Sequence, residues 1–339
     1  MRRRHLLGVG AGLLALPPVH RAAAQGGAQV GAQGGAQGAI WAPDRPIRLV
    51  YPYPPGGGGD IVSRILADRA RELLGQPLLV ENRPGAAGLV GAELVTRAPR
   101  DGHTLLVTAA ALSIAPSVYR RITFDPTKDL TAVALLTRLP LIVLTNPDGP
   151  YKSFADLVAA ARRDGDRITY GSFGIGSPPH LVGERINQEL GLTMTHVPYT
   201  GGAVALPAMI KGDISIGIFD GMSMLPHVQQ GRLRALAVTA ARRTPQLPDV
   251  PTLREGGVPH DIGTWHGAFM PGGTPEPIVR RMNEVCVQVM GMPEVRERVV
   301  TGGAVPVEPP LSPAGWAAAF AGEVAAWAAV AQRAKVVVE

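Results

Sequence analysis

Hydrophobic and polar positions alternate with two different periods along most of the chain. A short β-rich run at 47–51 is followed by four consecutive glycines, and then by an apolar stripe at helical spacing between residues 61 and 74. Asp60 is placed to cap this helix, and Gly75 is placed to end it. The pattern therefore predicts a strand, a glycine-rich loop and an amphipathic helix.

Strand and helix patterns continue in the same order. Strand-like runs at 78–80 and 104–108 lie on either side of a helical segment at 89–97. The order β-α-β-α-β is typical of parallel strands joined by right-handed helical crossovers. We therefore expect a parallel sheet in the first part of the chain.

The pattern repeats further on, where Ser153 and Asp156 have the spacing of a capping box. The other expected strands are 141–145, 168–171, 194–197, 214–219 and 233–238, and the other expected helices are 179–190, 202–211, 276–290 and 313–334. A chain of 339 residues also suits two domains. We predict an α/β fold of two halves, with the chain crossing between them near 136–141 and again near 256–266.

Basic, apolar and small residues follow one another at the start of the chain. Arg2 to Arg4 precede a short apolar run at 6–18, and Ala22 to Ala24 supply an A-x-A cleavage site. This order is typical of a secretory signal peptide over 1–24, and the paired arginines resemble a twin-arginine signal. An ordinary basic N-terminus is the alternative. We expect a low-complexity spacer at 25–40 and a periplasmic protein after it.

The net charge depends strongly on this leader. The whole chain has 33 Lys+Arg and 27 Asp+Glu, a net charge of +6, which alone favours nucleic acid or an anionic membrane as partner. Residues 1–24 hold four arginines and no acid, so 29 basic and 27 acidic residues remain. We therefore expect no nucleic-acid partner and no membrane attachment. The single cysteine, Cys286, excludes an intrachain disulfide and is expected to be a small buried hydrophobe.

Glycine-rich loops stand at the carboxyl ends of several expected strands. Ligands of open α/β sheets bind at these ends, and unpaired N–H groups at a helix N-terminus attract anions. The candidate loops are 53–60, 108–113, 172–180, 199–202 and 220–221. They match neither the phosphate-binding P-loop nor the dinucleotide motif. They predict a small anionic ligand, with tight turns that bind nothing as the alternative.

Catalytic and metal-binding patterns are absent from the sequence. There is no Gly-x-Ser-x-Gly motif. None of the histidines after the leader pairs at metal-ligand spacing; they are His103, His180, His196, His227, His260 and His266. We therefore expect no enzyme activity, no metal and no cofactor.

Individual polar residues of the loops each have more than one interpretation. His180 would pin its loop by a hydrogen bond, contact a ligand or act as a base. Asp60 would be a helix cap or a functional carboxylate. Asp220 would be a ligand contact or an acceptor that orients its loop, and Tyr53 and Tyr199 would be pocket walls or aromatics at the core edge.

Seven segments, in this order and spacing, carry a family resemblance. They are 46–60 (PIRLVYPYPPGGGGD), 80–88 (VENRPGAAG), 101–106 (DGHTLL), 171–177 (GSFGIGS) with His180, 196–199 (HVPY), 231–239 (GRLRALAVT) and 247–252 (LPDVPT). From about 42 to 335 the chain resembles the Bug-type solute receptors of tripartite tricarboxylate transporters.

The resemblance implies a periplasmic binding protein of type II, the Venus-flytrap fold, with two Rossmann-like lobes, a cleft and two crossover strands. It places 41–138 and 264–339 in one lobe and 139–263 in the other. It implies capture of a small organic carboxylate and delivery to the membrane permease subunits of the transporter, by a receptor expected to be a monomer. A periplasmic receptor that reports to a membrane signalling system, and a secreted enzyme on the same fold, are the alternatives.

The resemblance also implies how the carboxylate is held. The loops Gly57–Asp60 and Ser172–Ser177 would grip it from opposite lobes through backbone N–H groups and waters. Many relatives have Thr, Ser or Ala where Gly59 stands, so the choice of ligand does not carry over. The expected ligand-binding residues are Tyr53, Gly57, Gly58, Gly59, Asp60, Ala109, Ser172, Gly176, Ser177, His180, Tyr199, Thr200 and Asp220.

Overall fold

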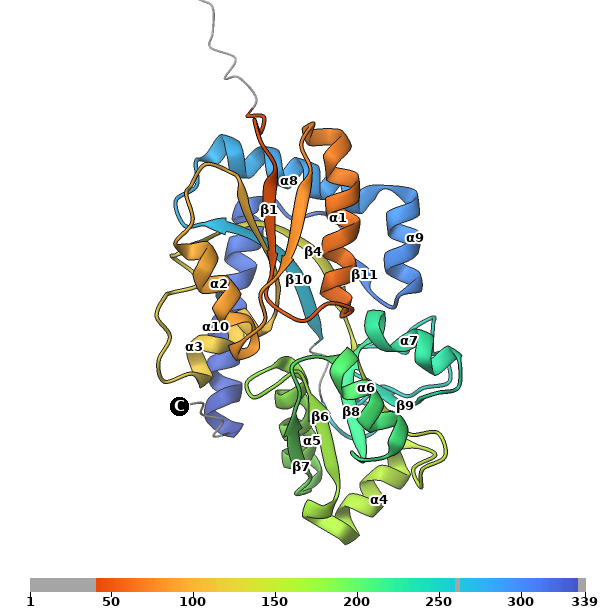
Figure 1. The fold of residues 1–339 in the computed structure, drawn as a ribbon. Helices are drawn as coiled ribbons and strands as arrows, with labels where there is room; N and C mark the ends of the chain where they lie inside the picture. The colour runs from red at the N-terminus through yellow and green to blue at the C-terminus, as the bar shows by residue number, and fades with distance from the viewer. Residues whose placement is uncertain (1–40, 260–262, 335–339) are drawn as a thin grey trace, which may run out of the picture. The chain divides into compact units, whose positions relative to one another are not determined.

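A computed structural model describes residues 41–259 and 263–334. The proposed signal peptide and spacer at 1–40, and His260, lie outside these residues. The described chain forms two β-sheets with helices packed on them, and Figure 1 shows α1, α2 and α8 around the first sheet and α4 to α7 around the second. The predicted α/β fold of two halves is confirmed.

The first sheet combines three parallel strands with an antiparallel part. Across the sheet, its strands are β11 (Val305–Pro306), β4 (Leu130–Leu139), β10 (Thr264–Pro271), β3 (Thr104–Ala109), β1 (Ile47–Tyr51) and β2 (Leu78–Asn82). β1 pairs in parallel with both β2 and β3, which confirms the β-α-β-α-β prediction. β10 pairs antiparallel with both β3 and β4, so a late segment of the chain lies in the middle of the sheet.

Helices cover both faces of the first sheet. They are α1 (Gly58–Leu74), α2 (Leu89–Thr96), α3 (Ala111–Val118), α8 (Glu276–Gly291), α9 (Pro293–Thr301) and α10 (Pro313–Ala334). The short segments α3 and α9 were not predicted. Cys286 on α8 is fully buried, as expected, and burial raises the pKa of its thiol to about 12.

The start of α1 corrects one prediction. The helix begins at Gly58 with Gly57 as its N-cap, so Asp60 lies within the first turn and is not the cap. An acidic residue there still complements the positive end of the helix dipole. Gly75 ends the helix in the left-handed conformation, with φ of 71°, as predicted.

The second sheet is also mixed. Across it, the strands are β7 (Thr195–Pro198), β6 (Thr169–Ser172), β8 (Ile216–Asp220), β5 (Leu141–Thr145) and β9 (Arg234–Val238). β6 is parallel to β7 and β8, whereas β5 is antiparallel to β8 and β9. The chain passes from the first sheet to the second at Pro140, between β4 and β5.

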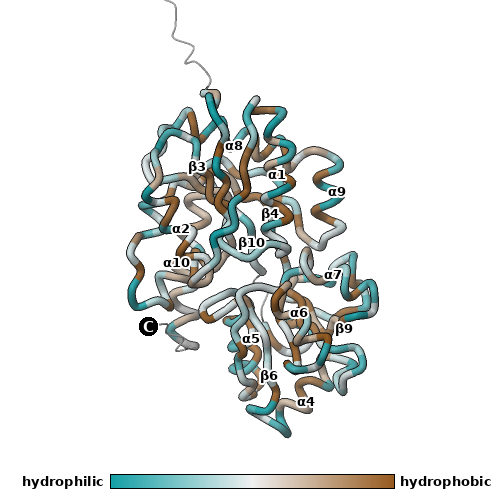
Figure 2. Tube along the Cα trace, in the orientation of Figure 1, coloured by the Kyte–Doolittle hydropathy of each residue, from teal (hydrophilic) through white to brown (hydrophobic). Residues whose placement is uncertain are grey.

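Four helices accompany the second sheet: α4 (Phe154–Asp164), α5 (Pro178–Leu190), α6 (Gly202–Lys211) and α7 (Gly221–Gln229). Ser153 and Asp156 form the predicted capping box at the start of α4. α7 was not predicted. Apolar residues dominate α6, which Figure 2 colours towards the hydrophobic end of its scale.

The long helix α10 contacts elements of both sheets. Trp316 and Phe320 pack with Trp265 and Phe269 on one face of the first sheet. Further along the helix, Trp327 packs in a cluster with Ile114 and Val118 of α3, and with Leu181 and Ala331. Because Leu181 belongs to α5, the end of α10 bridges from the first sheet to a helix of the second.

Candidate functional site

A narrow cleft of about 40 Å³ lies where the carboxyl ends of β1, β3 and β8 approach the N-termini of α1 and α6. It is lined from elements of both sheets by Tyr51, Tyr53, Pro54, Pro55, Gly57, Gly58, Gly59, Ala109, Phe173, Thr200, Gly201, Gly202, Ala203, Asp220, Thr264 and His266. The cleft therefore stands at the edge where open α/β sheets bind ligands.

The N-terminus of α1 presents backbone N–H groups to this cleft. The first hydrogen bond within the helix runs from the N–H of Ile61 to the carbonyl of Gly57, so the preceding N–H groups have no helical partner. A Cβ at Gly58 would lie 2.4 Å from Oδ1 of Asp220, and one at Gly59 would lie 2.6 Å from the Tyr51 ring. A larger residue at either position would have to displace the Asp220 carboxyl or the Tyr51 ring.

A second helix N-terminus lines the cleft from the other sheet. In α6 the first helical hydrogen bond runs from the N–H of Ala205 to the carbonyl of Gly201, which leaves the N–H groups of the first turn free of helical partners. The N-cap of α6, Gly201, has no side chain to occupy those donors. Two uncapped helix N-termini thus line one cleft, and both favour an anion there.

Asp60 supports the glycine loop from behind the cleft. Its Oδ2 accepts hydrogen bonds from the N–H of Gly56 at 3.0 Å and from Nε of Arg64 at 3.0 Å, and its Oδ1 accepts one from Nδ2 of Asn82 at 3.0 Å. Although burial opposes ionisation, the donors from Arg64, Gly56 and Asn82 hold the pKa of the carboxyl below its usual value. Asp60 does not line the cleft, and its contacts fix the shape of the loop.

Asp220 has the orienting role among the two interpretations that the sequence left open. Its Oδ1 accepts from the N–H of Ser223 at 3.0 Å and its Oδ2 accepts from Oγ of Ser223 at 2.9 Å, so it is the N-cap of α7. It also lines the cleft, and only 4% of the residue is exposed. Burial raises the pKa of this carboxyl above its usual value.

His266 is a cleft residue that sequence reasoning did not select. Its Nδ1 lies 3.0 Å from Oγ1 of Thr137 on the neighbouring strand β4, and it packs beside Gly59. Burial lowers the pKa of the imidazole to about 3, so the ring is neutral at ordinary pH. It is therefore a hydrogen-bonding group of the cleft without charge.

The Ser172–Ser177 loop turns its hydroxyl groups inward. Ser172 Oγ lies 2.6 Å from Nε2 of His196 and accepts from the N–H of Gly174 at 3.0 Å. Ser177 Oγ donates to the carbonyl of Gly174 at 2.7 Å. These hydroxyls hold the loop together and line neither the cleft nor the chamber next to it.

His180 also holds this loop. Its Nδ1 accepts from the N–H of Gly176 at 3.1 Å, which is the pinning role among its three interpretations. Its ring stacks on His196 with centroids 3.9 Å apart. Burial lowers the pKa of His180 to about 3 and that of His196 to about 4, so both rings are neutral.

An outer chamber adjoins the cleft and shares Tyr53, Pro54, Phe173 and Thr200 with it. Tyr199 lines this chamber. The expected residues that line the cleft itself are Tyr53, Gly57, Gly58, Gly59, Ala109, Thr200 and Asp220. Those that line neither cavity are Asp60, Ser172, Gly176, Ser177 and His180.

Sequence reasoning also missed cleft residues besides His266. These are chiefly Tyr51, Phe173 and the first turn of α6 from Gly201 to Ala203. The sequence marks 199–202 as a candidate loop that runs into a helix. That run was the available signal for the first turn of α6. Nothing local in the sequence marked Tyr51, which reads as the end of a buried strand.

The described residues that line the cleft include one acid, Asp220, and no lysine or arginine. Within 41–259 and 263–334, no group of three or more His, Cys, Asp or Glu side chains is arranged to hold a metal ion. An anion in this cleft would therefore be held by backbone N–H groups and neutral side chains.

The fold and the cleft define a two-lobed α/β solute-binding protein of the Venus-flytrap type. A family model for the tripartite tricarboxylate transporter family receptor matches residues 62–331, and the chain belongs to this family, which includes the Bug proteins. Family members are periplasmic solute-binding proteins. None of the helices in the described part of the chain has the length and apolar character needed to span a bilayer.

Similar proteins cover most of the chain. It is 35% identical over 257 residues to the UPF0065 protein in the tcbD-tcbE intergenic region of Pseudomonas sp. strain P51, which spans 75% of this chain and 76% of the relative. The periplasmic binding protein BugD superposes with a TM-score of 0.84 at 30% identity, over 88% of this chain and 100% of BugD.

Two similar structures contain ligands. MatC from Rhodopseudomonas palustris, solved with bound malate, has a TM-score of 0.80 and 32% identity over 85% of this chain and 99% of MatC. R. palustris Rpa4515, solved with adipate, has a TM-score of 0.83 and 32% identity over 87% of this chain and 99% of that protein. Both of these ligands are small carboxylates.

Proposed function

We propose that this protein is a periplasmic receptor that captures a small organic carboxylate between two lobes and delivers it to the membrane permease of a tripartite tricarboxylate transporter. The observation that carries the proposal is the pair of uncapped helix N-termini, α1 and α6, which line one cleft without a basic side chain. The carboxylates bound by MatC and Rpa4515 agree with it.

Backbone donors are sufficient for useful affinity. A carboxylate at a helix N-terminus gains about 0.3–1 kcal/mol, and each charge-assisted hydrogen bond contributes roughly 1.5–3 kcal/mol. Roughly four to six such bonds support a micromolar Kd, about −8 kcal/mol, after the costs of association and ordering.

The proposed carboxylate seat lies among Gly57, Gly58 and Gly59 of one lobe and Thr200 and the first turn of α6 of the other. Asp60, Ser172, Gly176, Ser177 and His180 would act from behind by holding the two loops in shape. Residues 41–138 and 264–339 would form one lobe, and residues 139–263 the other. Closure of these lobes on the ligand would present a changed surface to the permease.

Export and assembly complete the proposal. Residues 1–24 would direct the chain to the periplasm, by the twin-arginine route, and the mature receptor would act as a monomer. A receptor that reports to a membrane kinase would use the same closure. Cross-linking in membranes of the host separates the two, because a transport receptor is recovered with permease subunits and a sensor with a kinase.

Enzyme activity is not part of the proposal. Ser172 and His196 have the spacing of a nucleophile and its base, but Ser172 is fully buried and neither residue lines the cleft or the outer chamber. The ligand should therefore leave the cleft chemically unchanged.

Native mass spectrometry of protein purified from its host tests the function directly. We expect a bound mass of one small acid that disappears after denaturation and dialysis, and a thermal midpoint that rises when the acid is restored. If a broad panel of mono-, di- and tricarboxylates left the thermal midpoint of the ligand-free protein unchanged, carboxylate capture would be wrong.

A further inference from the structure

We propose that the ligand is an acid with a single carboxylate and an uncharged, ring-sized apolar body. The inference rests on the proposed function and narrows it. The carboxylate would sit at the N-terminus of α1, and the apolar body would extend between Tyr53 and Phe173 into the outer chamber.

The cleft and the outer chamber form one path for a ligand. They share Tyr53, Pro54, Phe173 and Thr200, so a molecule seated at the glycine loop can continue past these side chains. The outer chamber holds about 430 Å³, which is enough for a ring.

Aromatic side chains form the walls where the two cavities meet. Tyr53 lies against Tyr51, with ring centroids 5.3 Å apart, and Phe173 lies against Phe219 at 5.2 Å. Each wall is thus supported from behind by a second, buried ring. Aromatic faces held in this way favour a flat apolar body between them.

The far side of the outer chamber is also uncharged. Tyr119, Tyr199 and the side chain of Ile175, which is 41% exposed, line it. Ala86 and Ala87 also line the chamber, in a tight turn with positive φ values of 45° and 52°, and their side chains are short. An apolar ring would gain by leaving water for this surface.

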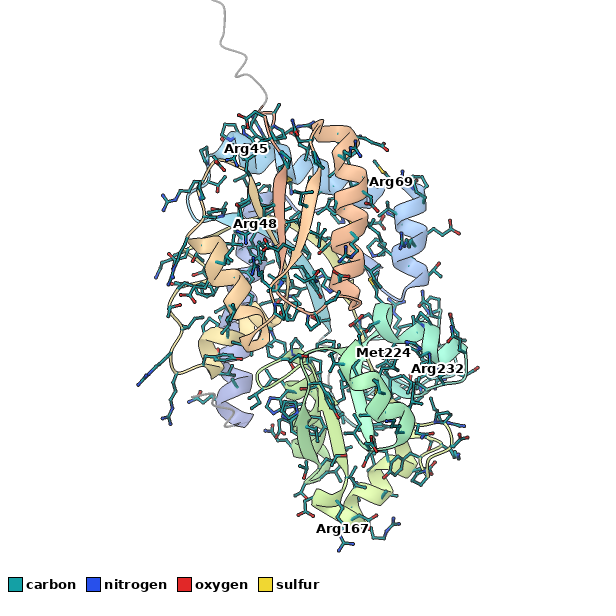
Figure 3. The ribbon with its side chains drawn as sticks, viewed as in Figure 1. Arg45, Arg48, Arg69, Arg167, Met224 and Arg232 are labelled. Carbon is teal, nitrogen blue, oxygen red and sulfur yellow. The ribbon has the colours of Figure 1, made fainter. Side chains whose placement is uncertain are left out.

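A second carboxylate carried into the outer chamber would find no basic side chain among the described residues of its walls. The described residues that line the two cavities include no lysine or arginine, and the arginines labelled at the outer ends of the molecule, Arg45 and Arg167, lie far from the cleft (Figure 3).

The loops around the outer chamber use several of their backbone donors internally. The N–H of Gly174 donates to Ser172 Oγ, and the N–H of Gly88 donates to the carbonyl of Gly85. The N–H of Tyr199 donates to the carbonyl of Ser172. These three N–H groups are therefore not free to hold a second carboxylate in the outer chamber.

The test compares two classes of acid on the ligand-stripped receptor. Benzoate, phenylacetate and cyclohexanecarboxylate represent the proposed class, and malate and adipate represent dicarboxylates of similar size. Isothermal titration calorimetry gives the Kd of each. We expect at least one acid of the first class to bind about ten-fold tighter than either dicarboxylate, which corresponds to ~1.4 kcal/mol.

Variants locate the apolar body. Phe173→Ala and the milder Phe173→Leu should weaken binding of the ring acid, with little change in thermal midpoint for the Leu variant. Leu79→Ala, at an exposed apolar residue on β2 outside both cavities, is the matched control and should leave the Kd unchanged.

The possible results distinguish the single-charge inference from the proposed function of carboxylate capture. If malate or adipate binds as tightly as the ring acids or tighter, or if Phe173→Leu leaves the Kd of the ring acid unchanged, the single-charge inference is overturned while carboxylate capture stands. If no acid of either class binds, the single-charge inference is overturned, and the proposed function fails as well if the broad panel of carboxylates leaves the thermal midpoint unchanged.

Discussion

Gly58 and Asp220 approach so closely across the cleft that a Cβ at Gly58 would lie 2.4 Å from Oδ1 of Asp220. Gly58 opens the helix that follows β1 of the first sheet, and Asp220 ends β8 of the second. At this point of the cleft, the backbone of Gly58 from the first sheet's side therefore lies against the carboxyl group of Asp220 from the second. A side chain at position 58 would have to displace one of them.

Gly58→Ala should weaken ligand binding by at least about ten-fold, ~1.4 kcal/mol. The new methyl group would push Asp220 away and fill space beside the free N–H groups of α1, whereas alanine suits the helical backbone there. Calorimetry on ligand-stripped protein measures the effect, and an unchanged Kd would contradict the proposed seat. Gly75→Ala is the control: its φ of 71° and open surroundings predict a stability loss of about 1 kcal/mol with the Kd unaffected.

A comparison of Asp220→Asn with the native protein should show how ionisation of Asp220 changes stability with pH. Burial raises the pKa of Asp220 in the folded state, so folding penalises the ionised carboxyl, and this penalty disappears as pH falls through the raised pKa. Asparagine carries no charge at any pH. Urea unfolding should therefore find the variant most favoured relative to the native protein near pH 7, with the difference shrinking towards pH 4. A difference independent of pH would refute this account.

Asp60→Asn should have the opposite pH dependence. The folded-state pKa of Asp60 is lowered, so its ionised form contributes stability above the unfolded pKa of about 3.9, and this contribution is lost as pH falls through the folded pKa. At pH 7 we expect a loss of about 1–3 kcal/mol because the bonds to Gly56 and Arg64 weaken. Urea unfolding at pH 7 and at pH 4 measures the effect. The control Asp164→Asn, which breaks an exposed ion pair with Arg163, should leave stability unchanged at both pH values.

Ser172→Ala should lower the thermal stability of the protein and should change its ligand affinity little. The buried hydroxyl is the partner of His196 Nε2 and of the Gly174 N–H, and leaving them unpaired costs about 1–3 kcal/mol. Thermal unfolding should show a clear decrease, with a smaller one for Ser177→Ala. If Ser172→Ala instead lost affinity at an unchanged thermal midpoint, the hydroxyl would belong to the ligand site and not to the loop.

The local pattern of the sequence was a good guide to single elements. The strand Ile47–Tyr51, the long helices α8 and α10 and the capping box at Ser153 follow from periodicity and end signals, because these depend on residues within a few positions of one another. α7 was missed because its single buried face, with Pro226 inside, has no clear helical stripe. Loop positions at strand ends also followed, since the carboxyl edge of a sheet is set by strand direction.

Tertiary structure decided which side chains face the cleft. His266 comes beside Gly59 because β10 inserts between β3 and β4, a pairing over more than a hundred residues that no local pattern encodes. Ser172 turns inward because His196, on the neighbouring strand β7, supplies a buried partner.

The sequence by itself determined that the chain carries glycine-rich helix starts suited to an anion, and that most of its basic excess lies in residues 1–24. Only the tertiary structure decided that α1 and α6 share one cleft, and that aromatic residues wall the path out of it. The physical reason is range: hydrogen bonds within a turn are set by neighbouring residues, whereas a cleft is made by segments that meet only when the sheets pair and pack.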